Sequence, residues 1–561
     1  MKPVPIAESM QKLRGVMQNY LEYKAKMAAA QPVTHSMEEA EPQFISRKVN
    51  DEVDTVAISP LHPEYMVIGT YHLLSVGEPR EYDAQMRRGT IQVMLVSPKW
   101  APRYSGMLPP TLDKLVFKCA ILDIRFHPTD PSIFAAATST GYMHFFRFVK
   151  QGDVLGRRVV TKLLPLGVVK VADPDEHGLE PSITQFNWIP DISNHGIQGI
   201  DDFHRLSLVY CTSFGDTSVV TADVPAIHDI FDHRLAKPVA NLEPTNYHVH
   251  KHKRNLEAWT VASAVLRTTR ESTYRIIFSG GDDEALIATS IDLGNTTSPS
   301  YIFDEFPTMK VDSWRDSRSH ESGVVAVLPL AKMHQPLDDG NHGIKLIMPF
   351  LTGSYDEQLR IFEMDVLTKR AVLVKTSPKF AGAVWRLKIM DEYNTLTTED
   401  GEIKLLENEE EHTNLRTKHF GGKLEHHILL LVSLSHAGAM ILRVTAVRGT
   451  VASECKWSMT ELVRFRGDHE SMVYCCDARL EPPPSLYPKF SYKAVRKTSR
   501  PHKDEPALGP TYTIVSASFY DCKICTWTFV DRLKGCAQLK PIERGEKSDR
   551  AAKPGFNRIP Y

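Results

Sequence analysis

The chain has 561 residues, far more than one core of roughly 100–200 residues requires, so it forms several domains or one large repeat fold. Hydrophobic residues make up 42% of it and charged residues 24%, which is typical of a folded globular protein and excludes a disordered one. The 67 basic residues nearly cancel the 68 acidic residues, so we expect neither nucleic acid nor a membrane as a direct partner.

The N-terminal residues predict an amphipathic helix rather than a secretory signal. The opening stretch MKPVPIAESMQKLRG lacks the continuous apolar segment of an export signal. Between Ile6 and Met27, apolar residues recur at spacings of three and four, the pattern of a helix with one apolar face. We expect residues 1–42 to form this helix and a linker, with the helix packed on the side of the fold or docked on a partner. The eight Cys fit free thiols in a reducing cytoplasm, where we expect the protein to act.

Seven stretches along the chain have the pattern of a β-hairpin. Four of them place an aspartate at the turn: YCTSFGDTSVVTAD, IIFSGGDDEALIATSID, LTGSYDEQLRIFEMD and IVSASFYDCKICTWTF. A short carboxylate accepts backbone N–H bonds at such a turn, so we expect structural roles for Asp216, Asp283, Asp356 and Asp521. Weaker copies span 66–96, 134–148 and 429–444. We expect His320 and His469, each followed by Glu-Ser, to brace the entrances of their repeats.

A further strand-like segment precedes each hairpin, and this regular order predicts the fold. The seven segments are VDTVAIS, ILDIRFHP, ITQFNWIP, EAWTVASAV, SGVVAVLPL, GAVWRLKIM and SMVYCCDARL. A strand, a gap, a hairpin and an outer strand, repeated seven times, indicate an all-β, seven-bladed WD40-type β-propeller. The period averages roughly 80 residues, about twice the usual WD repeat, so we expect long insertions between strands, including loops at 390–425 and 481–510.

The propeller is expected over residues 43–530, with a disordered Pro- and Lys-rich insert at 481–510 and a polar tail at 531–561. A single blade cannot cover both of its faces, so it is stable only between neighbours. Closure of the ring needs chain from near one terminus, and either Gln43–Val49 or the segment after Val530 could supply it. The ring would bring side chains from distant parts of the chain to a common axial channel.

No nucleophile elbow, phosphate-binding loop or H-E-x-x-H motif occurs in the sequence. YHVHKHKR places His248, His250 and His252 on one side of an extended strand, as metal ligands require, but its flanking basic residues favour a solvated loop. CKIC, at 522–525, has no second cysteine pair to complete a zinc site. We therefore expect no metal and no cofactor.

The first strands of the blades should border the channel, and they carry unusual side chains. Asp54, Asp123, Glu257, Trp259, Trp385, Arg386 and Tyr474 lie in these segments or at their starts. Carboxylates, an arginine and aromatic rings in one funnel can activate water, hold an oxyanion and bind a cationic group. Asp282 precedes the turn aspartate in GGDD, so the hairpin does not require it. For Glu257, Arg386 and Tyr474, functional and structural roles both remain open.

Six motifs, in this order, carry a resemblance to a known family: DTVAISP, FSGGDDEALI, TGSYDEQLRIFEMD, GAVWRLK, HESMVY and SASFYDCKICTW. Together they resemble the WD-repeat diphthine methylesterase family of diphthamide biosynthesis, over roughly residues 54–529. GGDDEALIATSID lacks the tryptophan expected near its end, IFEMD replaces Trp-Asp, and a long insert follows GAVWRLK. The chain therefore resembles a divergent member of this family.

The resemblance implies a monomeric carboxylic ester hydrolase without a cofactor. Its substrate would be the methylated diphthine intermediate on translation elongation factor 2, and demethylation would free the carboxylate for final amidation. The substrate's quaternary ammonium would suit aromatic walls formed by Trp259, Trp385 or Tyr474.

Without a nucleophile motif, we expect direct attack by water, with Glu257 or Asp282 as general base. Arg386, with Tyr355 or Tyr474, would stabilise the oxyanion. A buried Ser or Cys nucleophile is the alternative route, and it predicts a trappable acyl-enzyme. Two other functions stay open: a non-catalytic WD-repeat scaffold, and an RNA-associated adaptor that uses the basic insert at 481–510.

Overall fold

The computed structural model describes residues 42–74, 87–96, 111–152, 159–190, 203–253, 256–268, 273–293, 309–336, 344–398, 400–406, 422–448, 455–481 and 509–538. The chain divides into two compact units, Met1–Glu41 and Pro42–Tyr561, and only the second contains described residues. The expected N-terminal helix, nearly all of the 481–510 insert and most of the 531–561 tail therefore lie outside the described residues.

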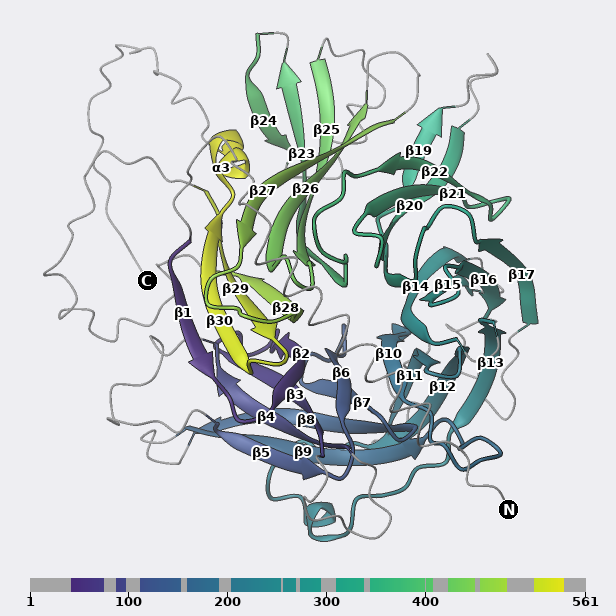
Figure 1. Ribbon diagram of the computed structural model, residues 1–561, viewed down its shortest axis with the longest axis vertical. Coiled ribbons are helices and arrows are strands. Elements are labelled where there is room, and N and C mark those ends of the chain that lie inside the picture. The colour runs from purple at the N-terminus through teal and green to yellow at the C-terminus, as the bar shows by residue number, and fades with distance from the viewer. Residues whose placement is uncertain are drawn as a thin grey trace, which may run out of the picture. The chain divides into compact units, whose positions relative to one another are not determined.

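The strands form seven antiparallel sheets that follow one another around a ring, which confirms the predicted seven-bladed propeller (Figure 1). Blade 1 contains β2 (Glu52–Ile58), β3 (Tyr65–Leu73), β4 (Arg87–Leu95) and β5 (Asp113–Phe117). Blade 2 contains β6 (Ile121–Phe126), β7 (Ile133–Thr138), β8 (Tyr142–Gly152) and β9 (Val159–Lys170). Blade 3 contains β10 (Ile183–Trp188), β11 (Phe203–Thr212), β12 (Asp216–Pro225) and β13 (Thr245–Lys251), with the short helix η3 (His233–Ala236) before β13.

The remaining blades include two with a fifth strand. Blade 4 contains β14 (Ala258–Thr268), β15 (Thr273–Gly281), β16 (Leu286–Asp292) and β17 (Met309–Asp316). Blade 5 contains β18 (Val324–Pro329), β19 (Met333–Pro336), β20 (Ile344–Ser354), β21 (Leu359–Asp365) and β22 (Ala371–Thr376). Blade 6 contains β23 (Arg386–Thr398), β24 (Ile403–Leu406), β25 (Gly422–Ser433), β26 (Ala439–Arg448) and β27 (Lys456–Phe465). Blade 7 contains β28 (Val473–Leu480), β29 (Thr511–Ser518), β30 (Lys523–Val530) and β1 (Phe44–Lys48), and helix α3 (Arg532–Gln538) follows it.

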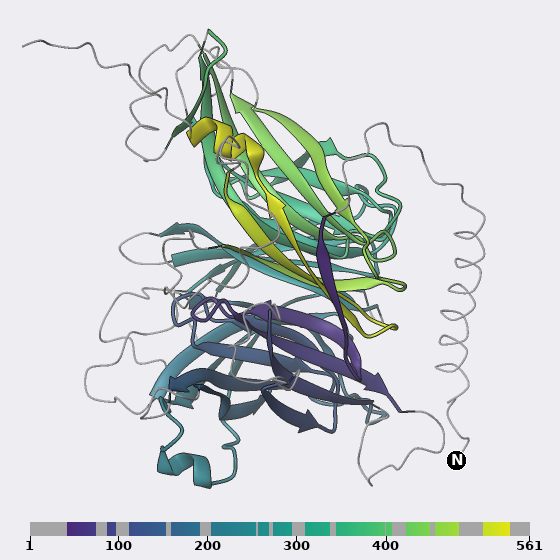
Figure 2. The same cartoon turned by 90° about the vertical axis from the view of Figure 1, so that its left-hand side faces the viewer.

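Strand β1 (Phe44–Lys48) closes the ring, so the N-terminal of the two candidate segments supplies the last strand. It pairs with β30 from Phe44 opposite Trp527 to Lys48 opposite Lys523, and Figures 1 and 2 show the two strands side by side. The guanidinium of Arg47 also donates to the carbonyl oxygens of Leu95, at 2.7 Å, and Val96, at 3.0 Å. One strand therefore completes blade 7 and binds it to blade 1.

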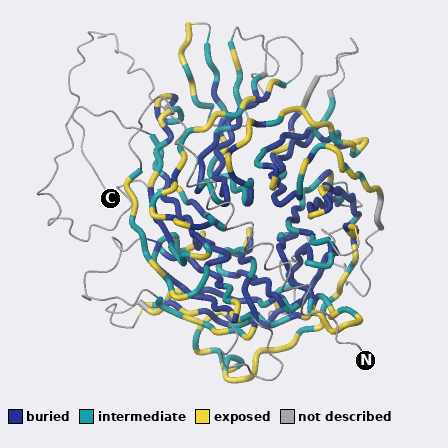
Figure 3. Tube along the Cα trace, in the orientation of Figure 1, coloured by how far each residue is buried: buried dark blue, intermediate teal, exposed yellow. Residues whose placement is uncertain are grey.

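Seven clusters of buried apolar side chains hold the ring together, and each joins two consecutive blades. The cluster at the closure packs Val53 and Ile68 of blade 1 against Val515 and Ile524 of blade 7. Buried residues follow the strands of every sheet, as Figure 3 shows in dark blue. Each blade is covered on both faces only because it has two neighbours, as expected of a closed propeller.

Hydrogen bonds between first strands fix the neighbouring blades relative to one another. A side-chain oxygen on one first strand accepts a backbone N–H from the first strand of the next blade. These bonds join Thr55 to Ile124 at 3.2 Å, Asp123 to Phe186 at 3.3 Å, Gln185 to Val261 at 3.0 Å, Thr260 to Val327 at 3.2 Å, and Asp477 to Ile58 at 2.7 Å. Asp123, which the sequence suggested as a channel carboxylate, thus links blade 2 to blade 3.

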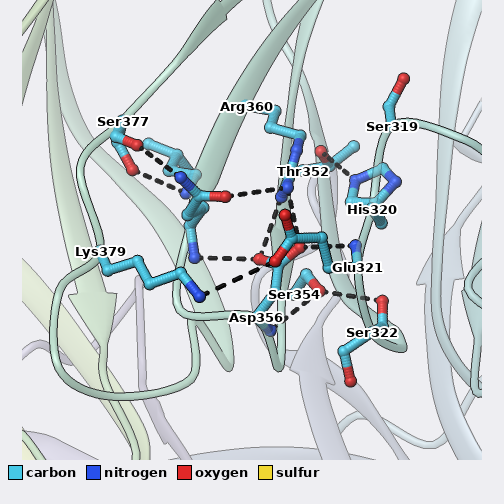
Figure 4. Close-up of polar contacts among 12 residues, drawn as sticks. Ser319, His320, Glu321, Ser322, Thr352, Ser354, Asp356, Arg360, Ser377 and Lys379 are labelled. Atoms are coloured by element: carbon cyan, nitrogen blue, oxygen red, sulfur yellow. Dashed lines mark hydrogen bonds and ion pairs between the residues drawn. The ribbon is translucent and has the colours of Figure 1, made fainter.

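Buried histidines connect three hairpin turns to the segment that enters the same blade. In blade 5, His320 contacts the hydroxyl of Thr352 at 2.9 Å, while Asp356 accepts the backbone N–H of Glu321 at 3.0 Å and pairs with Arg360 (Figure 4). Similar sets join His252 with Ser279 and Asp283, and His469 with Ser516 and Ser518 beside Asp521. Asp216 differs, because its carboxylate pairs with Lys251 at 2.8 Å.

Acid is expected to destabilise the propeller between pH 6.5 and pH 4. Burial lowers the pKa of each of His127, His320, His427 and His469 to about 4. Above pH 6.5 these rings are neutral in both the folded and the unfolded chain. Between pH 6.5 and pH 4 they bind protons only in the unfolded chain, so each histidine lowers the free energy of unfolding by about 1.4 kcal/mol per pH unit. Asp54 and Glu392 have raised pKa values in the fold, so they bind protons in the folded chain first and stabilise it as the pH falls. They are two groups against four histidines, so the net effect of acid is a loss of stability. Urea unfolding should therefore show a loss on the order of 3 kcal/mol from pH 7 to pH 5; a constant free energy of unfolding over this range would contradict the prediction.

Two expectations about connecting segments are wrong. YHVHKHKR is not a solvated loop: β13 ends in it, and His250 and His252 are only 6% and 3% exposed. Both rings reach the hydroxyl of Ser279 in blade 4 at 2.7 Å, so they are buried between blades. The described part of the expected loop at 390–425 is mostly strand, because β23 and β25 continue as one ladder as far as Thr398 opposite Gly422, and β24 pairs with β23.

Candidate functional site

The first strands of six blades each contain a β-bulge near their start, and three residues of the candidate site lie at these bulges. The register shifts between Val53 and Thr55, Ile121 and Asp123, Ile183 and Gln185, Ala258 and Thr260, Val324 and Ala326, and Val473 and Cys475. A bulge leaves one residue unpaired and redirects its side chain. The unpaired residues include Asp54, Trp259 and Tyr474, which therefore occupy equivalent positions in blades 1, 4 and 7.

Trp385 lies at the centre of an aromatic cluster that draws on four blades. It immediately precedes β23 and is 2% exposed. Its ring centroid lies 4.8 Å from that of Tyr474, 5.6 Å from that of Tyr355 and 5.7 Å from that of Trp259. The structure thus brings together all four aromatic residues that the sequence suggested for the site.

Arg386 places a cation against this cluster. The central carbon of its guanidinium lies 4.8 Å from the Trp385 ring centroid, within the range of a cation–π contact. Its Nη1 donates to the carbonyl oxygen of Trp385 at 3.2 Å and to that of Val325, the unpaired bulge residue of blade 5, at 3.4 Å. The guanidinium is therefore held at the level of the bulges.

Asp282 and Glu257 lie together at the edge of the cluster on blade 4. Asp282 is exposed, its Oδ1 accepts the indole N–H of Trp259 at 2.7 Å, and its backbone N–H donates to the Glu257 carbonyl oxygen at 2.9 Å. A Cβ on Gly323 would lie 3.0 Å from the Asp282 Oδ1 and 3.1 Å from the Tyr355 ring. The missing side chain of Gly323 therefore lets Asp282 and Tyr355 approach one another.

Burial sets the protonation of the groups around Arg386. It raises the pKa of Tyr474 well above its usual range, with a further contribution from Asp54 that Arg386 opposes. Although Tyr355 is 36% exposed, the protein around its hydroxyl raises the pKa, as do Asp282 and Glu257. Both phenols therefore remain hydrogen-bond donors at neutral pH. Burial also raises the pKa of Asp54 well above its usual range, an effect that Arg386 opposes and Asp123 reinforces.

The site has two halves of different exposure. Glu257, Trp259, Asp282 and Tyr355, on blades 4 and 5, are exposed or half-buried and combine negative charge with aromatic rings. The second half, from blades 6, 7 and 1, contains Trp385 and Asp54, which are 2% and 7% exposed, and Arg386 and Tyr474, which are half-buried. Sequence reasoning placed Asp54 in the channel without assigning it a role in the site. The signal that it missed is the bulge that Asp54 shares with Trp259 and Tyr474.

The buried Ser–His–Asp contacts do not have the form of a nucleophilic site. Ser279 is 0% exposed, and both His250 and His252 contact its hydroxyl. Blades 5 and 7 repeat the histidine–hydroxyl contact, which indicates bracing of the blade rather than one reactive centre. Burial raises the pKa of the Cys476 thiol to about 12 and that of Cys475 well above its usual range, so neither supplies a thiolate at neutral pH.

The described residues contain no group of three or more His, Cys, Asp or Glu arranged to hold a metal ion. Among the helices of the described ranges, none is long and apolar enough to cross a membrane.

Comparison with known proteins gives one informative result. No family model matches the chain. Among curated proteins, the chain is similar to diphthine methyltransferase of Schizosaccharomyces pombe, with 22% identity over 476 residues that cover 84% of this chain and 94% of the relative. The similarity confirms the resemblance that the ordered motifs indicated, and its low identity agrees with a divergent member.

Proposed function

We propose that the chain, which resembles diphthine methyltransferase along most of both sequences, acts in diphthamide biosynthesis as a carboxylic ester hydrolase. Its substrate would be the methylated diphthine residue of translation elongation factor 2, a folded protein that presents one modified side chain. Hydrolysis would release methanol and leave the carboxylate for amidation. The protein would work in the cytoplasm, as a monomer and without a cofactor.

The observation that carries this proposal is the convergence of Arg386, Trp385, Tyr355 and Tyr474 from three blades in one cluster. An arginine and two neutral phenols can donate hydrogen bonds to the oxyanion that forms when water attacks an ester. The exposed half, with Trp259 and Asp282, can bind a quaternary ammonium by cation–π and charge interactions. A scaffold without catalysis would not require these groups in one cluster.

The proposed activity is tested by incubating the purified chain with elongation factor 2 that carries methylated diphthine. We expect methanol release and loss of the mass of one methylene group from the modified peptide. The relative's name denotes methyl transfer, so a second arm offers demethylated factor and S-adenosylmethionine with a labelled methyl group. Label uptake without methanol release would replace hydrolysis by methyl transfer, and inactivity in both arms would favour the scaffold.

Replacing Asp282 by Asn is expected to weaken substrate binding more than chemistry. Loss of the charge beside Trp259 removes an electrostatic contact to the ammonium, so KM should rise about tenfold, with kcat within about threefold of wild type. Steady-state kinetics on the modified factor measure both values. An unchanged KM would show that Asp282 does not contact the cation.

A further inference from the structure

Asp54 is the one carboxylate in the buried half of the site. It is the bulge residue of β2, in the position that Trp259 and Tyr474 occupy in their own blades. Only 7% of it is exposed, and none of the hydrogen bonds among the described residues uses its side-chain oxygens. Its oxygens are not among the fully buried side-chain atoms that lack a partner, so they still reach solvent, and a carboxylate so placed can bind a water molecule.

The other two carboxylates are less suited to proton transfer. Asp282 is exposed, and one of its oxygens already accepts the Trp259 indole N–H at 2.7 Å. Glu257 lies beside it in the accessible half. A general base works best where bulk water is largely excluded, and Asp54, at 7% exposed, meets that condition better than the exposed Asp282 or the half-buried Glu257.

We propose that Asp54 is the catalytic carboxylate that moves the proton during ester hydrolysis, while Asp282 and Glu257 bind the cationic part of the substrate. This inference rests on the proposed hydrolase function and reassigns the base that the sequence suggested. Arg386 would hold the developing oxyanion between Asp54 and the aromatic cluster.

The reaction balances with water as the only co-reactant. The Asp54 carboxylate removes one proton from water as the water oxygen bonds to the ester carbon and the carbonyl electron pair moves to oxygen. The tetrahedral oxyanion then collapses, the bond to the methoxy oxygen breaks, and Asp54 returns its proton to the leaving methoxide. Methanol and the carboxylic acid result, and the acid releases its proton to solvent.

The surroundings of Asp54 support this role. Burial raises its pKa well above the usual range of a carboxyl, and a carboxylate with a raised pKa is a stronger base. The charged and titratable groups that act on it are Arg386 from β23, Asp123 from β6, Tyr474 and Cys475 from β28, and Tyr71 from β3. Arg386 is the cation among them, and it opposes the rise in the Asp54 pKa. Activity should therefore rise with pH as Asp54 ionises.

The test compares Asp54→Asn with Asp282→Asn in the full chain, on methylated elongation factor 2. We expect Asp54→Asn to lower kcat about 10²–10⁴-fold with KM within about twofold of wild type, and to remove the rising limb of the pH profile. Asp216→Asn, which alters an exposed ion pair in blade 3, is the matched control and should keep wild-type kinetics.

Adding formate to Asp54→Ala distinguishes loss of the catalytic carboxylate from damage to the fold. Formate can occupy the space of the lost carboxylate, so we expect it to raise the kcat of Asp54→Ala at least about tenfold. If neither variant folds, the wild-type pH profile decides: a rising limb with an apparent pKa above that of an ordinary carboxylate supports Asp54, and a flat profile overturns it. Wild-type kcat in Asp54→Asn, or the large kcat loss in Asp282→Asn instead, also overturns it. Absence of methanol release by the wild type overturns the hydrolase function and this inference together.

Discussion

Replacing Arg386 by Met is expected to lower kcat about 10²–10³-fold while the chain still folds. The guanidinium is the cation held against Trp385 at 4.8 Å, and its loss removes the charge available to the oxyanion. Because Arg386 opposes the rise in the Asp54 pKa, its removal should raise that pKa further and move the rising limb of the pH profile to higher pH. Steady-state kinetics between pH 5 and pH 9 measure both effects.

Two variants show whether this loss is specific. Arg386→Lys keeps the charge but not the planar group that stacks on Trp385, so its kcat should fall between those of wild type and Arg386→Met. Arg205→Met removes an exposed pair with Asp223 in blade 3 and should leave kcat unchanged. Wild-type turnover in Arg386→Met would exclude Arg386 from the chemistry.

Deleting residues 1–49 is expected to open the ring and destabilise the protein by at least about 3 kcal/mol. The deletion removes β1, its ladder with β30 and the two Arg47 bonds to blade 1. It also exposes the edge of β30, and an unpaired strand edge promotes aggregation. Urea unfolding gives the loss of stability, and limited proteolysis should cut first in blade 7.

Deletion of residues 1–41 is the matched control, because it ends before β1 and keeps the whole unit that begins at Pro42. We expect its unfolding midpoint to match that of the full chain. Arg47→Met keeps the strand but removes two hydrogen bonds from a charged donor, so it should be about 2–3 kcal/mol less stable than wild type. Equal stability of the full chain and the 1–49 deletion would mean that β1 is not needed for closure.

The architecture was predictable because it repeats. All seven segments proposed as first strands are strands at the start of a blade, from VDTVAIS in β2 to SMVYCCDARL in β28. Alternating apolar residues and turn aspartates mark each unit independently, so one weak copy does not obscure the others. The closing strand FISRK has no such redundancy, because five residues of mixed polarity acquire their role only beside β30 and blade 1.

The site was predictable only in part. Large aromatic residues and an arginine at the starts of first strands stand out against the apolar pattern, and Trp259, Trp385, Arg386 and Tyr474 indeed lie close together. Nothing in VDTVAIS shows that the register shifts at Asp54 and leaves its carboxylate in the site, because a bulge arises from pairing with β3. The burial of His250 and His252 was missed for the same reason: their partners belong to the next blade.

The most direct test of ester hydrolysis by this chain is one turnover of methylated elongation factor 2 in water labelled with heavy oxygen. Attack by water on the ester carbon predicts one heavy oxygen in the new carboxylate of the factor and none in the released methanol. Heavy oxygen in the methanol, or no methanol at all, would contradict hydrolysis by attack of water on the ester carbon.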